Sequence, residues 1–111
     1  MREAVSSSRD VIIRTGNWSE AVRFYESTLG FAVCHRSADL VGFETGAFRL
    51  YVERGAPHGA TFDFLVADVA ATKARLVAAG CTLVEENPGM PRCYLRDPHG
   101  LTFNIGVAAE R

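Results

Sequence analysis

Apolar and polar residues follow the same order of short patterns twice along the chain. In the first half, a β-branched run at residues 11–13 predicts a strand. A helix follows, because apolar residues recur there every three or four positions, at Trp18, Val22, Tyr25 and Leu29. Gly30 stands where a helix commonly ends in a left-handed residue. Strands are predicted next at residues 31–36, 40–44 and 48–53.

Polar residues mark the boundaries of these elements. Asn17 precedes the helical pattern and Glu20 stands three residues later, which is a capping-box signature. The pair at residues 45–46, Thr-Gly, suits a tight turn between the last two strands.

The second half repeats this order. A strand is predicted at residues 61–66, and Asp68 is expected to cap a helix that ends at Gly80. The buried stripe of that helix is expected to contain Val69, Leu76 and Val77. Further strands are predicted at residues 81–85, 92–96 and 101–107, with a Pro- and Gly-containing turn at residues 97–100.

The repeat predicts an α+β fold. Two βαβββ modules, at about residues 9–54 and 60–108, would form curved, partly open mixed sheets with helices on their outer faces. Gly and Pro residues at 54–59 predict a linker between them, within a single domain spanning residues 1–111. A ferredoxin-like sandwich is the alternative fold.

Net charge, apolar segments and cysteine content argue against several classes of protein. The net charge is −1 and no basic stripe is present, so we expect no nucleic-acid partner. The first nine residues lack an apolar run and no segment has the length of a membrane span, so we expect no signal peptide and no membrane partner. Three scattered cysteines, Cys34, Cys81 and Cys93, argue against a disulfide framework and favour a cytoplasmic location.

Two motifs connect the chain to a known superfamily. Residues 17–31 read NWSEAVRFYESTLGF, and residues 95–105 read LRDPHGLTFNI. Together they resemble the helix ending in "FY…LGF" and the "RDPDGN" hairpin of the vicinal-oxygen-chelate superfamily, which includes glyoxalases, bleomycin-resistance proteins and ring-cleaving dioxygenases. The resemblance extends from about Arg9 to Ala108.

The resemblance implies four positions that decide the chemistry. Metal-dependent members take ligands from the first and last strands of each module, on the concave side of the sheet, where a divalent metal stabilises an enolate or oxyanion. Strand alternation assigns these positions to Asp10, Arg49, Thr61 and Asn104. Arg49 has no lone pair to donate, and we expect it to pair with Asp10 on the adjacent strand. We therefore predict no metal and no cofactor.

The remaining reactive residues lack a ligand pattern. His35, His58 and His99 are isolated in the sequence, so they do not form a recognisable metal motif. Cys93 follows Arg92, but no histidine stands beside it, and we interpret it as a packing residue. A shifted strand register that brought His58, His35 or Glu53 near Asp10 would favour a metal site.

The resemblance then implies a small-molecule-binding protein of the bleomycin-resistance type, which acts by sequestration and forms a homodimer. Its ligand would be an antibiotic or aromatic metabolite, stacked on Tyr51. The predicted ligand-binding residues are Asp10, Ile12, Arg49, Tyr51, Thr61, Asp63 and Asn104. Two alternatives remain open: a metal-dependent lyase, epimerase or extradiol dioxygenase, and an accessory domain that binds an unknown metabolite.

Overall fold

The computed structural model describes residues 5–107, which form two compact units. Module one is Arg9–Thr61, and module two combines residues 5–8 with residues 62–107. Strands β1 (Ser6–Thr15) and β5 (His58–Leu65) each contribute residues to both units. The predicted linker is therefore shorter than expected, because its last two residues already belong to β5.

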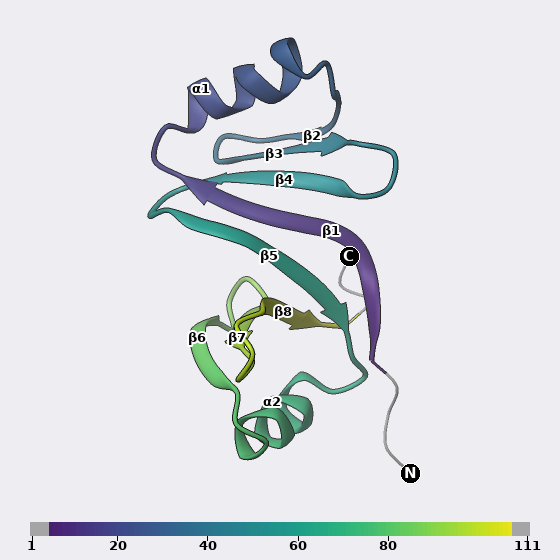
Figure 1. Cartoon of the computed structure of the whole chain (residues 1–111), viewed down its shortest axis with the longest axis vertical. Coiled ribbons are helices and arrows are strands. Elements are labelled where there is room, and N and C mark those ends of the chain that lie inside the picture. Colours follow the sequence, from purple (N-terminus) through teal and green to yellow (C-terminus); the bar gives the residue numbers. More distant parts are fainter. Residues whose placement is uncertain (1–4, 108–111) are drawn as a thin grey trace. The chain divides into compact units, whose positions relative to one another are not determined.

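Module one is a βαβββ unit (Figure 1). A helical segment follows β1 and consists of α1 (Trp18–Arg23) and the π-helical turn η1 (Phe24–Thr28). Three strands then complete the sheet in the order β2–β3–β4–β1. They are β2 (Ala32–Arg36), β3 (Leu40–Glu44) and β4 (Arg49–Arg54). Strand β1 runs parallel to β4, whereas the other neighbours are antiparallel, so the sheet is mixed.

The core of module one lies between its helix and one face of its sheet. Alternate residues of β3 and β4 are buried there together with Val22 of α1, namely Val41, Phe43, Leu50 and Val52. The indole Nε1–H of Trp18 donates a hydrogen bond of 2.9 Å to the carbonyl oxygen of Val52. Because successive strand residues point to opposite faces, the residues between these core positions lie on the face away from α1.

The first helix departs from two predictions. Its predicted capping box is wrong: the Asn17 side chain makes no capping hydrogen bond, because its backbone (φ −90°, ψ 49°) is not in the extended conformation that capping requires. Leu29 is 50% exposed and so does not belong to the buried stripe. Its N–H bonds to the carbonyl of Phe24, five residues back, and this wider turn carries Leu29 off the face defined by α-helical spacing.

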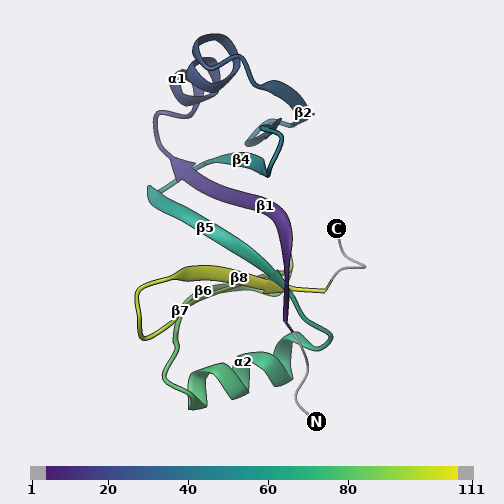
Figure 2. The same ribbon diagram turned by 45° about the vertical axis from the view of Figure 1, so that its right-hand side comes forward.

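Module two repeats the arrangement (Figure 2). After β5 come α2 (Val69–Ala78), β6 (Thr82–Asn87), β7 (Arg92–Arg96) and β8 (Thr102–Gly106), with strand order β5–β8–β7–β6. Strand β5 is parallel to β8, and the other pairs are antiparallel. The predicted cap is confirmed, since the Asp68 carboxylate accepts a 3.0 Å hydrogen bond from the N–H of Ala71.

Helix α2 covers one face of the sheet of module two. Val69 and Leu76 pack against buried strand residues that include Cys93, Leu95 and Ile105. Val77 was expected in this stripe but is 47% exposed, and Thr72 is buried in its place. Residues 69, 72 and 76 follow the three- and four-residue spacing of one helix face, and residue 77 lies about 100° from residue 76 around the helix.

The predicted fold class is confirmed in both units. Each is a βαβββ module whose helix covers one face of a mixed, unclosed sheet, with β2 and β6 as the outermost strands. Neither helix within residues 5–107 is long and apolar enough to cross a membrane.

Candidate functional site

The face of module one away from α1 carries pairs of side chains from β1 and β4. The parallel register places Asp10 opposite Arg49, Ile12 opposite Tyr51, and Arg14 opposite Glu53. These residues alternate with the buried core positions of the same strands. The structure therefore brings together four of the predicted ligand-binding residues, which are Asp10, Ile12, Arg49 and Tyr51.

Asp10 and Arg49 form an ion pair, as expected from the sequence. Arg49 Nε lies 2.8 Å from Asp10 Oδ1, and the side chains are 37% and 13% exposed respectively. The nearby Asp10 carboxylate raises the pKa of Arg49 above its ordinary value. Because Arg49 is more than a third exposed, solvent screening limits the value of the pair to about 1 kcal/mol or less.

A second ion pair lies on the same face. Arg14 Nε is 2.9 Å from Glu53 Oε1, and both side chains are largely buried, at 12% and 16% exposure. The register places the Ile12–Tyr51 pair between the two ion pairs. The centre of this face is therefore apolar and aromatic, and the charges on either side of it compensate one another.

Tyr51 lies against a glycine and near a histidine. Gly42 is opposite Tyr51 in the β3–β4 register, and a Cβ added at Gly42 would lie 2.6 Å from Tyr51 Cε1. His35 is opposite Gly42 on β2, and its ring centroid is 6.3 Å from that of Tyr51. We call Tyr51, Gly42 and His35 the aromatic patch. Burial, with a smaller contribution from Asp10, raises the pKa of the Tyr51 hydroxyl, which therefore remains a hydrogen-bond donor at neutral pH.

Module two holds a different kind of arrangement, a buried hydrogen-bond network. Asp63 and Asn104 are opposite each other on β5 and β8 and are 0% and 4% exposed. Asn104 Nδ2–H donates to Asp63 Oδ1 at 2.9 Å, and the Ser8 hydroxyl donates to Asp63 Oδ2 at 2.8 Å. The backbone N–H of Cys93 donates to Asn104 Oδ1 at 2.8 Å. Both polar atoms of the Asn104 side chain are thus used within the module.

Thr61 is not the strand neighbour of Asn104. It is buried, at 1% exposure, and its hydroxyl lies 3.4 Å from the carbonyl oxygen of Gly59. The β5–β8 register pairs Asn104 with Asp63, which is two residues further along β5. In module one, by contrast, Arg49 is paired directly with Asp10. Of the four positions that the resemblance implies, Asp10 and Arg49 are thus strand neighbours, whereas Thr61 and Asn104 are not.

Sequence reasoning missed three contributors to these arrangements. Gly42 and His35 belong to the aromatic patch, and the signal that was available for Gly42 was its place inside an apolar strand pattern, which indicates a close approach. Ser8 joins the Asp63 network because β1 begins at Ser6, earlier than the β-branched run suggested. No local pattern around Ser8 indicated that contact.

The residues at the implied ligand positions do not fit a divalent metal. Within residues 5–107, no three or more His, Cys, Asp or Glu side chains are grouped so that they could hold one. A guanidinium occupies one position and pairs with the carboxylate at another. The amide oxygen of Asn104 already accepts a backbone hydrogen bond. His58, considered as a substitute ligand, has its Nδ1 2.8 Å from the carbonyl oxygen of Gly59.

Comparison with known proteins gave a family match and structural matches. The model of a family described as "Glyoxalase-like domain" matches residues 10–106. A glyoxalase/bleomycin resistance protein/dioxygenase superfamily member from Vibrio splendidus 12B01 superimposes with a TM-score of 0.62 at 17% identity, covering 92% of this chain and 96% of that one.

Homoprotocatechuate 2,3-dioxygenase from Brevibacterium fuscum, in complex with 3,4-dihydroxyphenylacetate, gives a TM-score of 0.65 at 16% identity. The match covers 93% of this chain but only 36% of the dioxygenase. At these identities the likeness concerns the fold alone. No curated protein matches the chain.

Proposed function

Because the chain belongs to the glyoxalase-like domain family, we propose that it binds a small organic molecule on this fold without a metal ion. The proposed site is the face of module one away from α1, where Asp10, Ile12, Arg49 and Tyr51 lie together. The resemblance to bleomycin-resistance proteins makes sequestration of an antibiotic or aromatic metabolite the proposed role.

The Asp10–Arg49 ion pair is the main support for a site without a metal ion. A metal at this face would require lone-pair donors, whereas the guanidinium of Arg49 is a permanent cation that donates hydrogen bonds. Replacing the Asp10–Arg49 contact with an Asp10–metal contact would leave that cation facing a divalent ion at short range. A metal-dependent enzyme, the alternative function, would need a different donor at position 49.

The chemistry of the face indicates what it would bind. Tyr51 offers an aromatic surface for stacking, and Ile12 lies beside it in the strand register. The flanking ion pairs present both charges in fixed positions and no net charge. A flat aromatic molecule suits this pattern if it has polar substituents and little or no net charge. A highly charged molecule suits it less well.

Calorimetric titration with metal-free bleomycin, followed by a panel of aromatic antibiotics, tests the proposal. We expect saturable binding that Tyr51→Ala weakens at least tenfold, because the stacking surface is lost. Phe48→Ala is the matched control, since Phe48 is an exposed aromatic residue beside β4 and not part of the aromatic patch. Absence of binding across the panel, or equal losses in both variants, would contradict the proposed site.

Homodimer formation remains a prediction of the resemblance. Light scattering coupled to size-exclusion chromatography is expected to give twice the monomer mass. A monomer at all concentrations would remove the dimer from the proposal and leave ligand binding to a single chain.

A further inference from the structure

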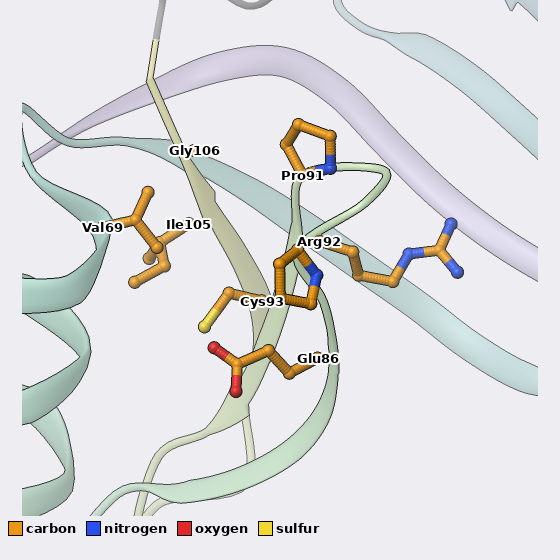
Figure 3. A pocket seen from close by; sticks show the side chains of 8 residues that line it. Val69, Glu86, Pro91, Arg92, Cys93, Ile105 and Gly106 are labelled. Carbon is orange, nitrogen blue, oxygen red and sulfur yellow. The ribbon is translucent and has the colours of Figure 1, made fainter.

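Module two contains a cavity on the helix-covered face of its sheet (Figure 3). It lies where the first turn of α2, the β6–β7 connection and the end of β8 meet, and its volume is about 200 Å³. None of the residues proposed above for ligand binding lines it. Apolar side chains form most of the wall, contributed by Val69, Pro88, Pro91, Cys93 and Ile105.

The size and lining of the cavity limit what it can hold. An enclosed apolar cavity of about 150 Å³ can bind benzene, so this partly open cavity has room for a single aromatic ring or an aliphatic group of similar size. Gly106 lines the cavity without a side chain and leaves space at the end of β8. The two proline rings are rigid, so the wall they form does not collapse easily.

The charged residues of the wall are already paired with other residues. The Glu86 carboxylate accepts hydrogen bonds from Lys73 Nζ at 2.9 and 3.1 Å. Arg92 forms an ion pair of 2.9 Å with Glu85, and its guanidinium carbon lies 5.1 Å from the centre of the Tyr94 ring. Figure 3 shows the Arg92 side chain extending away from Val69 and Ile105. An ionic ligand would have to displace these contacts, whereas a neutral one would not.

Cys93 places a buried thiol at the cavity. The residue is 2% exposed, and its sulfur points from β7 toward the side where Val69 and Ile105 lie (Figure 3). Burial, and to a smaller extent the Glu86 carboxylate, raise the pKa of the thiol, which stays protonated at neutral pH. A protonated thiol is a poor nucleophile and behaves as a small apolar group in packing.

We propose that this cavity is a second binding site, which takes a neutral, mainly apolar molecule of about one ring and holds it without a covalent bond. This assignment rests on the volume of the cavity, its apolar wall, and the ion pairs that Glu86 and Arg92 already form with Lys73 and Glu85. The site is independent of the aromatic patch in its residues, its module and its ligand chemistry.

The test is a titration of the full chain with fluorobenzene, followed by ¹⁹F NMR. We expect saturable binding that Val69→Phe weakens at least tenfold, because the added ring fills the cavity from the first turn of α2. Val77→Phe is the control: it makes the same change on the same helix at a residue that is 47% exposed, and it should alter the affinity less than twofold. Cys93→Met is expected to fill the cavity from β7. It serves as the alternative test variant if Val69→Phe fails to fold.

The thiols give a second readout. Bound fluorobenzene should slow the alkylation of Cys93 at least severalfold and leave that of the exposed Cys34 unchanged. No saturable binding, or binding that survives both filling variants, would overturn the proposal. Loss of fluorobenzene binding in Tyr51→Ala would assign the probe to the aromatic patch, which would refute the cavity while supporting the site in module one.

Discussion

Replacing Gly42 by alanine should destabilise module one through Tyr51. The new Cβ would lie 2.6 Å from Tyr51 Cε1 and 3.0 Å from Cδ1, whereas carbon atoms in contact are about 3.5–4.0 Å apart. The ring would have to move by about 1 Å, and overpacking of this kind costs about 1–3 kcal/mol. The lower backbone entropy of unfolded alanine offsets about 0.4–1 kcal/mol. We expect a net loss of about 1–2 kcal/mol in the free energy of unfolding.

Urea denaturation of the wild type and four variants measures this effect. Gly59→Ala is the control, since no atom lies within 4 Å of a Cβ at that strand position, so it should raise the free energy of unfolding by about 0.4–1 kcal/mol through the backbone entropy alone. Tyr51→Leu alone and combined with Gly42→Ala completes a double-mutant cycle, in which most of the cost of Gly42→Ala should disappear. An equal cost of Gly42→Ala with and without the tyrosine ring would refute the described packing.

Three further results are expected. Asn104→Ala should lower the free energy of unfolding by about 2–4 kcal/mol in urea, because it removes the buried acceptor of the Cys93 N–H and a donor to Asp63; a loss below about 1 kcal/mol would contradict the network. Backbone hydrogen bonds lower the pKa of Asp97, so its carboxylate should stabilise the folded protein relative to Asp97→Asn above about pH 4. This difference in the free energy of unfolding should disappear as the pH falls through the lowered pKa. Denaturation at several pH values measures it, and a pH-independent difference would contradict the described hydrogen bonds. When the native protein is alkylated and followed by mass spectrometry, Cys34 should react before Cys93. Cys34 is exposed, whereas burial raises the pKa of the Cys93 thiol. The reverse order would contradict the described burial.

Elements governed by local chemistry could be predicted from the sequence. Gly30 and Gly80 end their helices with φ values of 75° and 110°, and Asp68 caps α2 through the N–H of Ala71. Each depends only on residues a few positions away, which is why composition and spacing were sufficient. Strand alternation likewise assigned Asp10 and Arg49 to the same face, and the strand order that the resemblance implies put them on adjacent strands.

Features governed by tertiary packing could not be predicted in this way. The π-helical turn that exposes Leu29 is closed by backbone hydrogen bonds that no residue pattern specifies, such as that from the Leu29 N–H to the Phe24 carbonyl. The pairing of Asn104 with Asp63 depends on the register between β5 and β8, and a shift of two residues would preserve which face each side chain occupies. The alternation of apolar and polar residues therefore fits both registers equally well.

The contact between Tyr51 and Gly42 illustrates the same limit. The two residues are neighbours only because β3 and β4 pair with that register, and the space for the ring exists only because Gly42 lacks a side chain. The stacking role of Tyr51 remains a prediction, but the position of its ring depends on Gly42, which the sequence pattern did not assign to the site.

Metal content of the purified, tag-free protein tests the central claim most directly, with thermal melting in the presence of Ni, Zn, Mn, Fe(II) and Co ions as the companion measurement. Ligands that bind only the folded state raise the melting temperature by mass action. We expect far less than one metal ion per chain and no saturable rise in melting temperature. Near-stoichiometric metal, with a dose-dependent rise that Asp10→Asn abolishes, would contradict this expectation and assign the face to a metal-dependent reaction.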